Sequence, residues 1–205
     1  MVLLGLLVAM ISAATAAPAT SASVVVAFGD SITEGYGVAP GDDYPAQLER
    51  ALGARGLKVR VVNAGVSGDT TNNALDRVAS VVAAKPALVI LEFGGNDGLR
   101  GLSLNLTRKN LSELIARIQA AGARVSLIGM TLPKNYGSGY LGKFEQIYKD
   151  LAGQHKVTLI PLAPAAVLGG GKGLMQADGI HPTAAGYKQF VAYLLPFVEK
   201  ELRER

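Results

Sequence analysis

A serine, an aspartate and a histidine stand where they could act together on an acyl group. Ser31 follows an apolar run at residues 24–28, and Asp178 and His181 lie three residues apart near the other end of the chain. A carboxylate at that spacing can hold the imidazole in one tautomer, while the second ring nitrogen takes a proton from a serine hydroxyl. We therefore predict Ser31 as the nucleophile, His181 as the general base and Asp178 as the acid that orients it.

Each of these residues also has an ordinary structural explanation. A serine after a strand is commonly a helix N-cap, and His181 and Asp178 could be a surface helix cap and a loop carboxylate. The other histidine, His155, stands beside Lys156 at a predicted helix end, where histidine is usually solvated. With two histidines, no cysteine and no His-Glu-x-x-His string, no metal site and no cofactor are expected.

Acyl transfer also needs hydrogen-bond donors where negative charge develops on the carbonyl oxygen. Gly68 offers a backbone N–H with no side chain in the way, Asn96 offers a side-chain amide, and Ser31 offers its own N–H. We predict that these three groups form an oxyanion hole. Taken singly, Gly68 and Asn96 are equally well explained as turn residues, and it is their joint presence that favours the catalytic interpretation.

The elements that must position these residues alternate along the chain. Apolar runs predict five strands, at residues 24–28, 58–63, 87–93, 124–130 and 157–160. Helical patterns lie between and after them, beginning near Asp43, Thr71, Thr107, Tyr140 and Thr183. This alternation predicts an α/β fold, a three-layer α/β/α sandwich with a five-stranded parallel sheet like that of flavodoxin. Ligand sites of such sheets lie beyond the carboxyl ends of the strands, where Ser31, Gly68 and Asn96 fall.

Composition narrows the class of protein further. At 205 residues with 49% hydrophobic side chains, the chain can bury one substantial core, so we expect a single domain at residues 23–205 and a monomer. The net charge of +4 is scattered, with no polybasic run, which argues against nucleic acid as a partner. The glycine cluster at residues 169–173 has no Ser or Thr after its lysine, so we predict a loop there and exclude a P-loop.

The first 17 residues differ from the rest. They hold an apolar run too short to span a bilayer comfortably, followed by small residues with A-x-A spacing. This pattern predicts a secretory signal peptide cleaved near Ala16 to Ala19, a mature chain without a membrane span, and a periplasmic or secreted location. Because no Lys or Arg precedes the apolar run, an uncleaved anchor or a different start site stays open as an alternative.

Four short strings carry a family resemblance. Gly29-Asp30-Ser31, Ser67-Gly68-Asp69, Gly95-Asn96-Asp97 and Asp178-x-x-His181 match in order and position the four sequence blocks of the SGNH, or GDSL-type, hydrolase superfamily. The chain resembles in particular the bacterial thioesterase I, lysophospholipase L1 and arylesterase family. Signatures of this family look like residues 94–101, 132–137 and 178–182 of the present sequence. The resemblance implies an SGNH hydrolase fold and a serine esterase that acts on aryl esters, acyl thioesters and lysophospholipids.

An acyl chain needs an apolar wall, and the loops after the third and fourth predicted strands offer one. We predict substrate contacts from Leu99, Leu102, Leu132 and Tyr136, although these residues could equally close the local core. Two other functions stay open from the sequence. One is a carbohydrate O-deacetylase on the same fold, which the absence of Trp and of long insertions disfavours. The other is a non-catalytic flavodoxin-like binding module, which would have no need of Ser, Gly, Asn, Asp and His at these positions.

Overall fold

The computed structural model of the chain describes residues 22–161, 163 and 173–204. Both the predicted signal peptide and residues 169–172 of the glycine cluster lie outside these ranges. The strands are β1 (Ser23–Gly29), β2 (Val59–Gly65), β3 (Leu88–Glu92), β4 (Arg124–Ile128) and β5 (Thr158–Ile160). The helices are α1 (Ser31–Glu34), α2 (Tyr44–Ala54), α3 (Thr71–Ala83), α4 (Gly95–Leu99), α5 (Leu104–Ala120), α6 (Ser138–His155) and α8 (Ala184–Arg203), with a 3-10 turn η1 (Lys134–Tyr136).

The strands form one parallel sheet in the order β2-β1-β3-β4-β5. The chain therefore moves outward from β1 to β2 and then returns to the other side of β1 to form β3. The point where the direction reverses lies between β1 and β3, and ligands of open parallel sheets bind outside the strand ends at such a point. In the strand register Gly29 pairs with Gly65 of β2 and with Glu92 of β3, so three strands end side by side.

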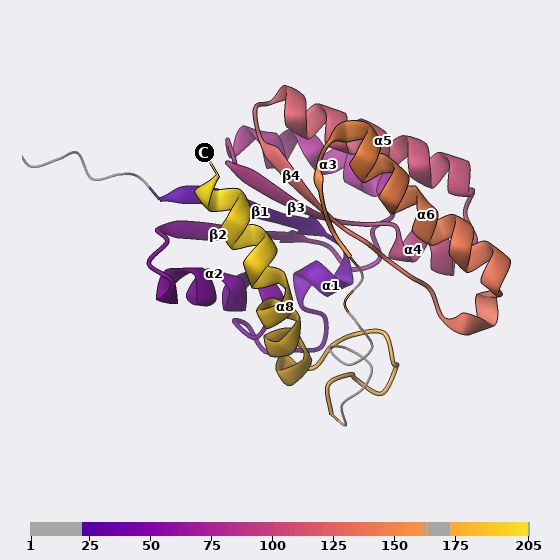
Figure 1. Cartoon of the computed structure of the whole chain (residues 1–205). Coiled ribbons are helices and arrows are strands. Elements are labelled where there is room, and N and C mark those ends of the chain that lie inside the picture. The colour runs from indigo at the N-terminus through magenta and orange to yellow at the C-terminus, as the bar shows by residue number, and fades with distance from the viewer. Residues whose placement is uncertain (1–21, 162, 164–172, 205) are drawn as a thin grey trace, which may run out of the picture.

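Helices cover both faces of the sheet, with α3, α5 and α6 on one side and α2 and α8 on the other (Figure 1). The side chains of β1 alternate between the two cores, with Val26 and Phe28 in the first and Val25 and Ala27 in the second. A strand buried on both faces needs an unbroken apolar run, which is what residues 24–28 supply. The predicted three-layer α/β/α sandwich is confirmed.

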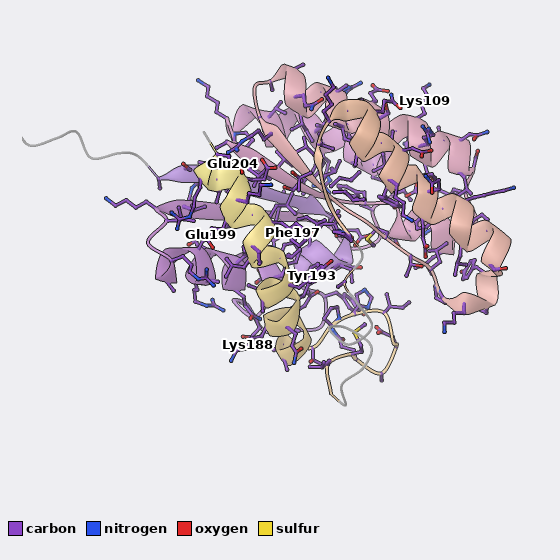
Figure 2. All side chains as sticks on the ribbon, viewed as in Figure 1. Lys109, Lys188, Tyr193, Phe197, Glu199 and Glu204 are labelled. Atoms are coloured by element: carbon purple, nitrogen blue, oxygen red, sulfur yellow. The ribbon has the colours of Figure 1, made fainter. Side chains whose placement is uncertain are left out.

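The last helix, α8, lies along the outside of the sheet (Figure 1). Its buried stripe includes Tyr187, Leu194 and Val198. Tyr193 and Phe197 are labelled along the same helix in Figure 2, and Tyr193 Oη donates to the carbonyl of Pro161 just beyond β5, at 3.2 Å. No helix in the described ranges is long and apolar enough to cross a membrane.

The structure corrects two details of the predicted helices. Asn96, which could also be explained as a turn residue, lies in the short helix α4. The helix expected to begin near Thr107 begins at Leu104, after Ser103. Thr107 is instead buried in the first turn, where its hydroxyl contacts the Ser103 carbonyl and the Asp97 carboxylate. A buried threonine facing a carboxylate has a tertiary role that local capping rules do not reveal.

His155 also differs from the expectation of a solvated helix end. It is half-buried at the end of α6, and Ser112 Oγ of α5 lies 2.7 Å from its Nε2. The backbone carbonyl of His155 accepts a hydrogen bond from Gln119. The residue therefore joins α5 to α6 on the face of the sheet that those helices cover.

Candidate active site

Ser31 is the first residue of α1, at the turn that leaves β1. Asp30 rather than the serine caps the helix, because Asp30 Oδ1 accepts the backbone N–H of Ile32 at 3.1 Å. The serine hydroxyl is thereby left for other contacts. The turn is tight, since a Cβ on Gly29 would lie 2.0 Å from Thr33 Oγ1 and 2.4 Å from Glu92 Oε2. Glycine is required at that position for the chain to pass.

The loop before α8 brings the predicted acid and base to this serine. His181 Nε2 lies 2.8 Å from Ser31 Oγ, and His181 Nδ1 lies 2.7 Å from Asp178 Oδ2. The other carboxylate oxygen, Asp178 Oδ1, accepts the backbone N–H groups of Ile180 and His181. The three side chains thus form one continuous hydrogen-bonded line, although Ser31 and His181 are 150 residues apart in sequence.

The electrostatics of this line suit proton transfer. The hydrogen bonds from the His181 side chain and from the backbone N–H groups of His181 and Ile180 lower the pKa of Asp178 to about 2. Asp178 is therefore an anion at neutral pH, where it can hold one imidazole tautomer and stabilise an imidazolium. Such a line can move a proton from a serine hydroxyl to a histidine and on to a leaving group.

Two residues that the sequence analysis did not single out hold the histidine loop against the serine loop. Gln176 donates from its side-chain nitrogen to the carbonyls of Tyr36 at 2.7 Å and Pro182 at 3.0 Å, and its backbone N–H donates to the His181 carbonyl. The ring of Tyr36 lies against the His181 ring, with centroids 4.7 Å apart. Gln176 and Tyr36 are not set apart by any sequence motif, so only the folded chain shows that they lie beside the histidine.

The three predicted oxyanion donors meet at the same cavity, whose wall includes Ser31, Gly68 and Asn96. Gly68 has a φ of +83°, a conformation that favours glycine, and its carbonyl accepts a hydrogen bond from Arg100 at 2.8 Å. The side-chain nitrogen of Asn96 lies 3.1 Å from Asp30 Oδ2 and 3.0 Å from the carbonyl of Asp69.

Buried polar contacts fix the loops that carry these donors. Asp97 is 2% exposed and accepts the backbone N–H and the hydroxyl of Thr71, which ties α4 to α3. Ser67 donates from its backbone N–H and its hydroxyl to Glu34 at the end of α1. Asp69 is paired with Arg77 at 2.6 Å. The loop after β2 is therefore anchored on both sides of Gly68.

A cavity of about 730 Å³ opens beside the serine. Of the predicted substrate contacts, Leu99 and Leu132 line it. Leu102 and Tyr136 are not among the lining residues. Leu102 is 39% exposed, and the hydroxyl of Tyr136 donates to the Leu99 carbonyl. Apolar wall residues that the sequence analysis did not name include Ile32, Tyr36, Ile128, Met130, Ile180 and Phe190.

Within the described ranges, no group of histidine, aspartate and glutamate side chains could hold a metal ion. A serine, a histidine and an aspartate joined in one hydrogen-bonded line at the switch point of a parallel sheet define the class of serine hydrolases. Residues 27–189 match the GDSL-like lipase/acylhydrolase family, and the chain belongs to it. It is an enzyme of the serine esterase type, as the sequence blocks predicted.

Named relatives agree with this placement. The chain is 40% identical to the esterase TesA of Pseudomonas aeruginosa over 86% of its own length and 88% of the relative. It is 36% identical to the thioesterase 1/protease 1/lysophospholipase L1 of Escherichia coli over 80% and 77% of the two chains. The crystal structure of TesA superposes with a TM-score of 0.83 at 38% identity, covering 87% of this chain and 99% of that one. The SGNH hydrolase fold is thereby confirmed.

Proposed function

We propose that this enzyme hydrolyses carboxylic esters and acyl thioesters through an acyl-enzyme on Ser31. The observation that carries the proposal is the line of hydrogen bonds from Asp178 through His181 to Ser31, which lines a mostly apolar cavity. A serine hydroxyl is a weak nucleophile by itself, and a neighbouring histidine held in one tautomer activates it.

The reaction has two halves. Ser31 Oγ attacks the acyl carbonyl carbon while its proton passes to His181 Nε2, and the resulting oxyanion accepts hydrogen bonds from the Ser31 N–H, the Gly68 N–H and Asn96 Nδ2. His181 then gives the proton to the departing alkoxide or thiolate, which leaves the acyl group on Ser31. In the second half, water loses a proton to His181 as it attacks the acyl carbon. The tetrahedral intermediate then collapses while His181 returns the proton to Ser31 Oγ, which releases the carboxylic acid and the free serine.

The shape of the cavity supports acyl chains as the recognised part of the substrate. Its volume of about 730 Å³ falls within the range of small-molecule sites, and its wall is mostly apolar. We propose that Leu99 and Leu132 contact the acyl chain of the substrate. Because relatives are named as an arylesterase and as a thioesterase and lysophospholipase, we propose aryl esters, acyl-CoA and lysophospholipids as substrates.

We further propose that the enzyme is exported, with residues 1–17 as its cleaved signal peptide and residues 23–205 as one domain that acts as a monomer. The apolar run and the A-x-A spacing support export. Expression of the full chain in a bacterium, followed by fractionation, size-exclusion chromatography and intact mass measurement, tests these points. A periplasmic product that begins after Ala16 to Ala19 is expected, and a cytoplasmic product of full mass would contradict export.

The activity is tested with p-nitrophenyl esters from acetate to palmitate and a matched acyl-CoA, using wild type and Ser31→Ala. We expect turnover of medium or long chains that vanishes in the variant while the thermal unfolding midpoint is kept. Turnover of acetate alone would favour a deacetylase, and an active Ser31→Ala protein would contradict the mechanism.

A further inference from the structure

Two buried carboxyl groups lie directly behind the serine turn and take no part in the proton transfer described above. Asp30 is 3% exposed, and Glu92 at the end of β3 is fully buried. Glu92 Oε2 accepts the backbone N–H of Asp30 at 3.2 Å and the hydroxyl of Thr33 at 2.8 Å. Asp30 Oδ2 in turn accepts the side-chain amide of Asn96. A chain of hydrogen bonds therefore runs from Glu92 through Asp30 to the amide proposed as an oxyanion donor.

We propose that Asp30, held in place by Glu92, is a positioning residue that orients the side-chain amide of Asn96 toward the nucleophile. This inference rests on the proposed function, in which that amide stabilises the oxyanion.

The chemistry of the amide supports this role. An asparagine side chain has a donating nitrogen and an accepting oxygen, and only the nitrogen can stabilise an oxyanion. Asn96 Nδ2 faces two acceptors, Asp30 Oδ2 at 3.1 Å and the Asp69 carbonyl at 3.0 Å. A flipped amide would set its oxygen against both acceptors and make neither bond. Asp30 also directly precedes Ser31, so its side chain links the turn that carries the nucleophile to the Asn96 amide.

The same two bonds make the donation selective for charge. In the free enzyme the nitrogen of Asn96 already donates to Asp30 and Asp69. A neutral substrate carbonyl has no advantage over the Asp69 carbonyl for one of these N–H groups, whereas a fully developed oxyanion does, and Asp30 keeps the other N–H. The interaction therefore strengthens as the tetrahedral intermediate forms, which is how binding energy raises kcat rather than lowering KM.

Glu92 is the member of the pair that carries a proton. Its Oε1 atom is buried and makes no hydrogen bond to any residue in the described ranges, a position unfavourable for a charged oxygen. Burial raises the pKa of Glu92 well above its usual range, and the charge of Asp30 raises it further. Burial also raises the pKa of Asp30, to about 6, although the hydrogen bond from Ile32 and the contact with Glu92 lower it. Near neutral pH the pair therefore holds one charge, on Asp30, where it faces Asn96.

The other ionisable groups around the pair leave that charge in place. Tyr44 of α2, Tyr148 of α6 and Tyr187 of α8 all face it, and burial raises the pKa of each tyrosine hydroxyl, so they stay neutral. The His181 imidazole, when protonated, lowers the pKa of Asp30. Arg77 of α3 reaches the Gly29 carbonyl at 3.4 Å while it is paired with Asp69. The Asp30 carboxylate accepts its hydrogen bonds from two neutral groups, the Ile32 N–H and the Asn96 amide.

The test is a double-mutant cycle between Asp30→Asn and Asn96→Ala. Asparagine caps a helix as well as aspartate does, so the turn before Ser31 is kept. In either orientation, however, the amide that Asp30→Asn introduces satisfies only one of the two N–H groups that the carboxylate accepts. We expect each single variant to lower kcat about 10²-fold with little change in KM. The double variant should be no more than about threefold slower than either single one, because both remove the same donor. Asp76→Asn, on the exposed side of α3, is the matched control and should keep wild-type kcat.

The possible failures can be told apart. Effects that multiply to about 10⁴-fold, or an Asp30→Asn protein with wild-type kcat, would overturn the positioning role and leave the proposed function standing. An Asn96→Ala protein with wild-type kcat would remove the oxyanion donor and the positioning role together.

A second readout needs no catalysis and keeps Asp30 intact. In the His181→Ala protein, which has no titrating imidazole at the site, the side-chain amide resonances of Asn96 should shift with a midpoint at or above the Asp30 pKa of about 6, because the imidazole that lowers this pKa is gone. Resonances that keep the values of a freely exposed asparagine amide at every pH from 4.5 to about 8 would show that no carboxylate holds the amide, and would overturn the inference.

Discussion

Asp178 and His181 face each other across a single turn, with Asp178 Oδ2 2.7 Å from His181 Nδ1, and the backbone N–H groups of the same turn hold the other carboxylate oxygen. The turn itself therefore fixes the carboxylate, so the histidine ring has a defined orientation before substrate arrives. Such preorganisation is what a general base needs, because no reorganisation accompanies the proton transfer.

Replacing Asp178 with Asn should lower kcat for a p-nitrophenyl ester by up to about 10⁴-fold, since an amide nitrogen facing Nδ1 favours the wrong tautomer. Asp150→Asn is the control, because Asp150 is an aspartate on α6 paired with Arg108 instead of a histidine. An Asp178→Asn enzyme within about tenfold of wild type would show that the carboxylate does not orient the base.

Glu92 should make the protein less stable as the pH rises. Its carboxyl loses its proton near the ordinary value of 4.5 when the chain is unfolded, whereas burial keeps it protonated in the folded state. The folded state then binds more protons, so the free energy of unfolding falls with increasing pH above that value, by at most about 1.4 kcal/mol per pH unit.

Glu92→Gln removes this contribution. Urea denaturation at about pH 5, 6.5 and 8 should therefore show the stability of the variant rising relative to wild type as the pH increases. A difference that is the same at all three pH values would mean that the carboxyl titrates alike in the folded and unfolded states.

Gly29→Ala should prevent stable folding, because the new methyl group would lie 2.0 Å from Thr33 Oγ1 and 2.4 Å from Glu92 Oε2, two buried atoms joined by a hydrogen bond that Thr33 donates. The matched control is Gly53→Ala on α2, where an added Cβ meets nothing within 4 Å and alanine should add up to about 1 kcal/mol of helix stability. Thermal unfolding of both proteins decides the matter. A Gly29→Ala protein with the thermal unfolding midpoint of wild type would show that the turn can accommodate a methyl group.

Leu132→Ala should shift the acyl preference toward longer chains. Leu132 lines the cavity, so its removal opens space that an additional methylene can fill, at about fourfold in kcat/KM for each methylene buried. The measurement is the ratio of kcat/KM for dodecanoate and butyrate esters, which does not depend on the fraction of folded enzyme. Leu102→Ala, at an exposed leucine outside the wall, should leave the ratio unchanged. Equal ratios in both variants would place the acyl chain elsewhere.

Local pattern was sufficient to predict the fold. The apolar run of β1, buried on both faces, and the caps Asp43 and Thr183 are features whose physical cause lies within a few residues. The short motifs also identified the residues that the structure brings together at one cavity, because reaction chemistry restricts residue type at Ser31 and His181. Gly68 and Asn96 follow from the same requirement.

Residues that act only through tertiary contacts gave no such signal. Gln176 bridges two loops that are 140 residues apart, and Thr107 faces the Asp97 carboxylate. In the sequence, Glu92 is only the last residue of an apolar strand. The fold brings its carboxyl group to the backbone N–H of Asp30. Tyr36 meets the histidine only because the loop before α8 returns to α1. Their roles depend on which strands become neighbours, and that information is spread over the whole chain.

Ser31 is the residue that becomes acylated in the proposed mechanism, and covalent labelling tests this most directly. A fluorophosphonate, which reacts with activated serine hydroxyl groups, should add one equivalent to the protein, and peptide mapping should place the added mass on Ser31. The label should be lost in Ser31→Ala and greatly slowed in His181→Ala, where the general base is missing. A label that maps to another residue, or that persists at full stoichiometry in Ser31→Ala, would contradict acylation at Ser31.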